Sequence, residues 1–138
     1  MIAYVDSSVV LRLVLGQPGA LREWRTVDRG VASALVEVEC LRTLDRLRIA
    51  DGLAETDLAA RREAVYRLVE TLEIVEPTRP ILTRAAQPLP VSLGTLDAIH
   101  LATALAWREM NATDLVLATH DARLSVAARA LGLEIVGS

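Results

Sequence analysis

The sequence contains no phenylalanine, and aromatic residues make up only 3% of its 138 residues. Its core must therefore consist of Ala, Val, Leu and Ile. Hydrophobic residues at 52% and charged residues at 24% exclude a disordered tail and a fibrous repeat. A chain of this length buries roughly two thirds of its unfolded surface. We therefore expect one aliphatic domain spanning residues 1–138.

Cysteine is also scarce. The single cysteine, Cys40, has no partner in the chain and cannot form an internal disulfide. Because its neighbours are aliphatic and follow a helical pattern, we expect a buried thiol in a reducing compartment.

An excess of positive charge is absent, since the formal net charge is −3. The protein therefore has no global positive field of the kind that attracts nucleic acid. This does not exclude a nucleic-acid partner, because a metal site built from carboxylates itself makes a protein acidic. There is also no glycine-rich phosphate loop, which argues against a nucleotide-binding protein.

Long hydrophobic runs are missing as well. The apolar opening of the chain lacks a basic segment and includes Asp6 and Arg12, unlike a signal peptide. A later uncharged run, residues 99–107, is too short to span a bilayer. We expect a cytoplasmic protein with no membrane partner.

Short apolar segments alternate with segments of helical periodicity along the chain. This alternation predicts an α/β fold, a short parallel sheet flanked by helices on both faces. Ser33, Thr56 and Thr95 are expected to cap helices. Strands are predicted over residues 2–5, 31–32, 72–75, 115–118 and 133–136, and helices after Asp6, over 20–27, 34–50, 56–72, after Pro80, over 95–110 and over 121–131.

Acidic side chains follow two of the predicted strands. Asp6 comes directly after the strand 2–5, and Asp121 follows the strand 115–118. Ligand sites of parallel sheets lie at the carboxyl ends of strands, and hard divalent cations prefer carboxylate oxygens. The alternative is that both residues are only helix N-caps. Asp114 precedes its strand and is not included.

A third acid, Glu39, is surrounded by apolar residues on the helix 34–50. A half-buried carboxylate is costly unless it is paired or bound to a metal. Helical spacing places Glu39 on one face with Arg42 and Arg46. An ion pair to either arginine is therefore the alternative to a functional role.

Asp97 is the fourth candidate, in the first turn of the helix 95–110. The alternative is that it only interacts favourably with the helix dipole. His100 shares its side of the helix and is expected to be a hydrogen-bonding residue rather than a ligand, whereas His120 is expected in a loop. Neither histidine has a spacing to Cys40 or a serine that indicates a nucleophilic triad.

The four acids lie in four stretches of sequence, and a fifth stretch follows near the end of the chain. These stretches are IAYVDSS (2–8), SALVEVECLRTL (33–44), TLDAIHLA (95–102), LATHDARL (117–124) and AARALGL (127–133). In their order and spacing they resemble the PIN-domain ribonucleases, specifically the VapC-type toxins of bacterial and archaeal toxin–antitoxin pairs. The resemblance covers the whole chain.

This resemblance implies an acidic cluster around Mg²⁺ or Mn²⁺ that hydrolyses RNA and leaves 5′-phosphate and 3′-hydroxyl ends. It also implies a small antitoxin protein as partner, and self-association into a homodimer or a higher assembly. Spacing from Ser33 favours Glu39 over Glu37 as a member of the cluster. The implied site consists of Asp6, Glu39, Asp97 and Asp121, with Thr119 and Ser7 in support and Arg12, Arg42, Arg46 and Arg123 as candidate contacts for RNA or antitoxin.

Two other functions compete with this interpretation. One is a phosphohydrolase acting on another phosphoester, with Asp6 as its nucleophile. Such enzymes usually carry a second acid two residues later, where this chain has Ser8. The other is a catalytically silent binding module of the same fold. The retention of four costly carboxylates argues against it.

Overall fold

A computed structural model describes residues 1–138. Five parallel strands form one sheet in the order β3-β2-β1-β4-β5. The α/β fold with a short parallel sheet is thus confirmed. The strands are β1 (Ile2–Val5), β2 (Arg29–Ser33), β3 (Glu73–Val75), β4 (Val116–Ala118) and β5 (Glu134–Val136).

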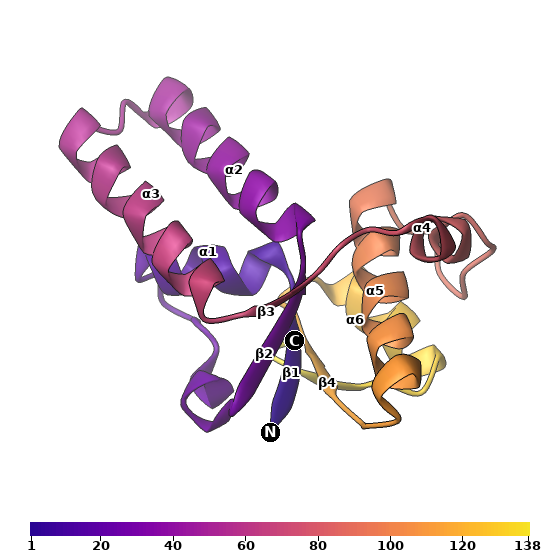
Figure 1. Ribbon diagram of the computed structural model, residues 1–138. Coiled ribbons are helices and arrows are strands. Elements are labelled where there is room, and N and C mark those ends of the chain that lie inside the picture. The colour runs from indigo at the N-terminus through magenta and orange to yellow at the C-terminus, as the bar shows by residue number, and fades with distance from the viewer.

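Helices cover both faces of the sheet (Figure 1). On one side lie α1 (Ser7–Leu15), α2 (Leu35–Asp51) and α3 (Glu55–Glu70), with α2 and α3 side by side. On the other side lie α4 (Arg79–Ala85), α5 (Thr95–Asn111) and α6 (Ala122–Ala130). No helix combines the length and apolar character needed to cross a membrane.

The strands are apolar on both faces because each face is covered by helices. Along β1, Ala3 and Val5 pack into the core beneath α1 and α2, whereas Tyr4 packs into the core beneath α5 and α6. Val31 and Ala32 of β2 divide between the two cores in the same way. This alternation turns Tyr4 towards α5, although its strand neighbours face the other layer.

Three local expectations were wrong. Residues 20–27 form only a short 3₁₀ helix, η1 (Arg22–Thr26), which no side chain caps. An isolated segment of this length is too short to sustain an α-helix without packing along it. Thr56 and Thr95 do not cap their helices: each lies inside the first turn, and the caps are Ala54 and Gly94.

Pairing in the centre of the sheet brings the ends of two distant segments together. Val5 of β1 lies beside Ala118 of β4, and the N–H of Asp6 donates to the Ala118 carbonyl at 3.4 Å. The residues after each strand, Asp6 and Thr119, therefore emerge side by side. β1 also pairs with β2 on its other edge. The strand order therefore reverses at β1, and ligand sites of open parallel sheets form at the carboxyl ends of the strands at such a reversal.

Candidate active site

Asp6 ends β1 and caps α1, so the capping interpretation is correct for this residue. Its Oδ1 accepts hydrogen bonds from the Val9 N–H at 3.2 Å and from the Ser8 hydroxyl at 2.6 Å. The side chain is buried, with 3% exposed. Capping uses one oxygen, and the second oxygen faces the end of β4.

Thr119 connects Asp6 to Asp121. Its hydroxyl donates to Asp6 Oδ2 at 2.5 Å and accepts from the Asp121 N–H at 3.0 Å. Asp121 in turn caps α6, where its Oδ1 accepts from the Leu124 N–H at 2.8 Å. The Ser8 hydroxyl also accepts the His120 N–H at 3.0 Å. Two hydroxyls thus tie the loop after β1 to the loop after β4.

Glu39 reaches the same region from α2, and it pairs with neither Arg42 nor Arg46, so the alternative interpretation as an ion pair does not hold. Its Oε2 accepts from the Ser7 hydroxyl at 3.1 Å, and its Oε1 lies 2.5 Å from His100 Nε2. Arg42 instead pairs with Asp45 on the same helix, and Arg46 donates to the Thr43 hydroxyl. The structure thus places Glu39 between α1 and α5.

Asp97 projects from the first turn of α5 into the same acidic environment. Burial raises the pKa of this carboxyl, and repulsion from Asp121, Asp6 and Glu39 raises it further, in that order of size. Of the charged groups that shift it, only His100 lowers the pKa. The four predicted acids therefore share one electrostatic neighbourhood without an arginine to offset their charge.

No set of three His, Cys, Asp or Glu side chains forms a ready-made metal cage. This geometry still fits Mg²⁺, which keeps several of its waters and is usually held by one or two carboxylates. Mutual repulsion among the four carboxylates also suits a divalent ion. Asp6 is the most deeply buried of the four acids, and Asp97 is repelled by the other three.

Tyr4, which the sequence interpretation missed, belongs to the surroundings of the site. Its hydroxyl lies 2.6 Å from His100 Nδ1 and accepts the Ser33 N–H at 3.2 Å. His100 is 1% exposed and makes hydrogen bonds, as expected. The available signal was a tyrosine, one of two in the chain, within an aliphatic strand two residues before Asp6.

A groove of about 450 Å³ opens beside Glu39. Of the four candidate contact arginines, Arg42 and Arg46 line it. Arg123 is exposed in the first turn of α6, close in sequence to Asp121. Arg12 lies in the last turn of α1 and donates to the Gly19 carbonyl at 3.4 Å, so the structure does not bring it to the acids. The groove is lined by Ser7, Val38, Glu39, Arg42, Thr43, Arg46 and Leu96.

Cys40 is fully buried next to the site, and its thiol donates to the Ser7 carbonyl. Burial raises the pKa of this thiol to about 12, with smaller contributions from Glu39 and Asp6. The thiol is therefore protonated and unreactive at neutral pH.

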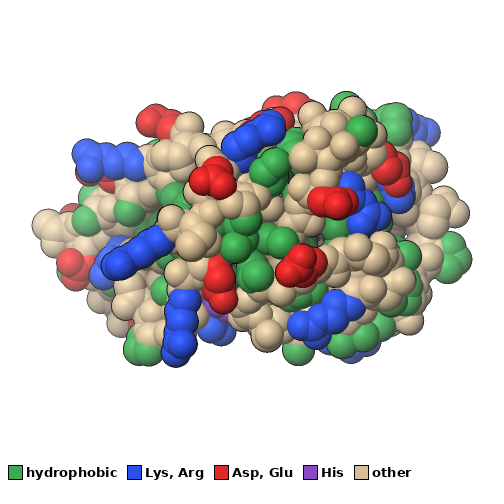
Figure 2. All heavy atoms as spheres, turned by 90° about the horizontal axis from the view of Figure 1, so that it is seen from below, with side chains coloured by type: hydrophobic (Ala, Val, Ile, Leu, Met, Phe, Trp, Pro, Cys, Tyr) green, Lys and Arg blue, Asp and Glu red, His purple; other side chains and the backbone are tan.

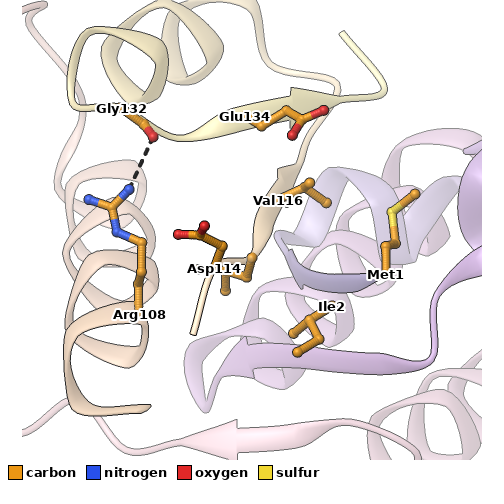
Figure 3. A pocket seen from close by; sticks show the side chains of 8 residues that line it. Met1, Ile2, Arg108, Asp114, Val116, Gly132 and Glu134 are labelled. Carbon is orange, nitrogen blue, oxygen red and sulfur yellow. Dashed lines mark hydrogen bonds between the residues drawn. The ribbon is translucent and has the colours of Figure 1, made fainter. Parts of the chain in front are cut away.

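The opposite edge of the sheet carries a different surface. Seen from below, arginines and acids are interspersed around an apolar patch, and neither sign of charge gathers there (Figure 2). A hollow of about 330 Å³ at this edge is lined by Asp114 and Glu134, with Arg108 bonded to the Gly132 carbonyl (Figure 3). None of the predicted site residues lines it, and Asp114 lies away from the four acids.

The fold and the acidic edge define an α/β domain with its polar residues gathered where β1 and β4 end. The family model described as PIN domain matches residues 3–130. Ribonuclease VapC46 of Mycobacterium tuberculosis (strain ATCC 25618 / H37Rv) is 36% identical over 137 residues, 96% of this chain and 95% of the relative. The chain belongs to the PIN domain family.

Solved structures agree with this fold. FitAcB from Neisseria gonorrhoeae superimposes with a TM-score of 0.72 at 17% identity, over 99% of this chain and 96% of that chain. A toxin–antitoxin complex from Klebsiella pneumoniae superimposes with a TM-score of 0.66 at 19% identity, over 89% of each chain. At these identities the likeness concerns the fold.

Proposed function

We propose that this protein is a metal-dependent endoribonuclease that acts as the toxin of a toxin–antitoxin pair. The observation that carries the proposal is the gathering of Asp6, Glu39, Asp97 and Asp121 at one sheet edge, where their repulsion is not offset by arginine. A relative that matches nearly the whole chain is named a ribonuclease, which supports the same activity. A toxin–antitoxin complex among the structural neighbours supports the biological role.

In this mechanism Asp6, Asp97 and Asp121 would hold Mg²⁺ or Mn²⁺, and Glu39 would contribute directly or through water. The bound ion would lower the pKa of a water and stabilise charge on the leaving oxygen of the phosphodiester. Thr119 keeps the Asp6 carboxylate turned towards the site, since its hydroxyl donates to Oδ2. Ser7 restrains Glu39 in the same manner.

Digestion of total cellular RNA by the purified chain tests this function. We expect discrete fragments in Mg²⁺ or Mn²⁺, none in EDTA, and 5′-phosphate and 3′-hydroxyl ends when the fragments are sequenced. Intact RNA with folded, metal-loaded protein would instead indicate a silent binding module, or an enzyme that acts on another phosphoester.

Arg42 and Arg46 are proposed to bind the RNA backbone, because they line the groove beside Glu39. The double variant Arg42→Ala/Arg46→Ala should bind single-stranded RNA more weakly at low salt. Each lost phosphate contact should reduce the slope of log K against log salt by about 0.7. Fluorescence anisotropy across a salt series measures this slope.

Arg48→Ala is the matched control for this pair. Arg48 lies on the same helix and also pairs with Asp45, but it does not line the groove. Its loss should leave RNA affinity and the salt slope unchanged. Equal losses in the control and the double variant would mean that the helix, rather than the groove, meets RNA.

An antitoxin is proposed to cover this groove, which exposes Val38 and Leu96 beside its two arginines. Self-association also belongs to the proposal. Val9, Val10 and Val14 of α1 and Val65 of α3 are buried in the core, so these side chains do not contribute to a contact with a second copy.

A further inference from the structure

Three side chains from different elements form a continuous hydrogen-bond chain that ends on Glu39. Tyr4 of β1 contacts His100 of α5 at 2.6 Å, and His100 contacts Glu39 of α2 at 2.5 Å. Tyr4 and His100 are almost completely buried, whereas 14% of the Glu39 side chain is exposed. The chain therefore runs from the centre of the sheet to the rim of the acidic site.

The proton positions along this chain follow from the contacts. The Ser33 N–H donates to the Tyr4 oxygen, so the phenolic proton is free to point at His100 Nδ1. When the Tyr4 hydroxyl donates to Nδ1, the ring proton is on Nε2 and points at Glu39 Oε1. The hydrogen-bond partner of one ring nitrogen thus determines whether the other nitrogen donates or accepts a hydrogen bond.

Glu39 is held at both oxygens by this arrangement. His100 contacts Oε1, and the Ser7 hydroxyl contacts Oε2. The nearby arginines make their contacts elsewhere, with Asp45 and Thr43. The direction of the Glu39 carboxylate is therefore determined from inside the protein, through a ring that cannot move freely.

We propose that His100, oriented by Tyr4, is the positioning residue for Glu39 and holds its carboxylate ready for a divalent cation. This inference rests on the function proposed above. His100 touches neither the cation nor the RNA in this scheme, and it acts only through Glu39. Outer partners that orient a ligand typically change metal affinity or activity by about 10–100-fold when they are replaced.

Two substitutions of His100 separate positioning from packing. In His100→Gln the longer side chain places an amide near the position of Nε2, where it can still donate to Glu39. In His100→Asn the amide lies near the position of Nδ1, where it can contact Tyr4 but cannot reach Glu39. Tyr4→Phe leaves the imidazole without the partner that fixes its tautomer.

Isothermal titration of RNA-free protein with Mn²⁺ provides a readout independent of catalysis. We expect about 10–100-fold weaker Mn²⁺ binding in His100→Asn, recovery of most of the affinity in His100→Gln, and an intermediate loss in Tyr4→Phe. The RNA cleavage rate at subsaturating Mn²⁺ should follow the same order.

Trp107→Phe is the matched control on the same helix. Trp107 is buried and donates to Glu73 at 3.0 Å, away from the acidic cluster. Its replacement should lower thermal stability but leave Mn²⁺ affinity unchanged. If His100→Asn does not fold, the comparison of Tyr4→Phe with Trp107→Phe decides the question.

Wild-type Mn²⁺ affinity in both His100→Asn and Tyr4→Phe would overturn the proposal. Equal losses in the Gln and Asn variants would also overturn it, because they would indicate packing alone. A wild-type protein that binds Mn²⁺ but cuts no RNA would refute the nuclease function, and the Mn²⁺ series would still test His100. A wild-type protein that binds no Mn²⁺ would refute both.

Discussion

Asp6→Asn is expected to abolish RNA cleavage while the fold stays intact. Asp6 is proposed to be a direct ligand, so its loss should lower the rate by more than the roughly 100-fold that removal of an outer partner can cost. Asn caps helices about as well as Asp, so the hydrogen bond from the Val9 N–H is kept. Only the Thr119 hydroxyl loses its acceptor, at a cost of about 1 kcal/mol.

Asp6→Ala separates the two roles of this residue. Alanine also removes the cap, which costs a further ~1 kcal/mol, and it leaves the Ser8 hydroxyl without its acceptor. Both variants should be equally inactive, whereas only the Ala variant should lose clear stability in urea. An Asn variant that keeps a tenth or more of the wild-type rate would exclude Asp6 as a ligand.

Asp97→Asn is expected to make the metal-free protein more stable. Burial and three neighbouring acids raise the pKa of Asp97, so the folded state binds this proton more tightly than the unfolded state. At neutral pH the ionised carboxylate therefore destabilises the fold. The helix dipole favours a first-turn acid by about 0.3–1 kcal/mol, which offsets part of this cost.

The advantage of the Asn variant should depend on pH and on metal. It should be largest near neutral pH and disappear as the pH falls below the ordinary carboxyl pKa of about 4, where Asp97 is protonated in both states. Mn²⁺ should raise the melting temperature of the wild type more than that of the variant. Each kcal/mol moves the midpoint by roughly 4 °C in a chain of this size, so scanning calorimetry in EDTA and in Mn²⁺ resolves the effect. A variant less stable than the wild type in EDTA at pH 7 would contradict the shared acidic neighbourhood.

The parallel sheet was predictable because its strands are short apolar runs placed between helical segments. The positions of Asp6 and Asp121 followed from the same pattern. Asp6 comes directly after β1, and Asp121 lies in the short loop after β4. Cap positions were less predictable: Thr95 has the right chemistry, but the helix starts at this residue and Gly94 occupies the cap. Local preference did not determine where these helices begin.

The contacts of Glu39 could not be predicted from its own helix. Arginines at helical spacing made an ion pair the alternative for Glu39, but its partners, Ser7 and His100, lie 32 and 61 residues away in sequence. Tyr4 was missed for the same reason, since its partner is 96 residues away. Which side chain meets Glu39 depends on how α1, α2 and α5 pack around the sheet, and single-sequence periodicity carries no information on that.

The central claim is that the acids at the ends of β1 and β4 form one cation-binding centre. Anomalous diffraction at the manganese edge, from crystals of the wild-type protein grown with Mn²⁺, tests it most directly. We predict a peak among the carboxylates of Asp6, Asp97 and Asp121, on the side that Glu39 faces, and no such peak in Asp6→Asn crystals. A saturated Mn²⁺ site elsewhere, in a protein that cuts RNA with that metal, would contradict the claim.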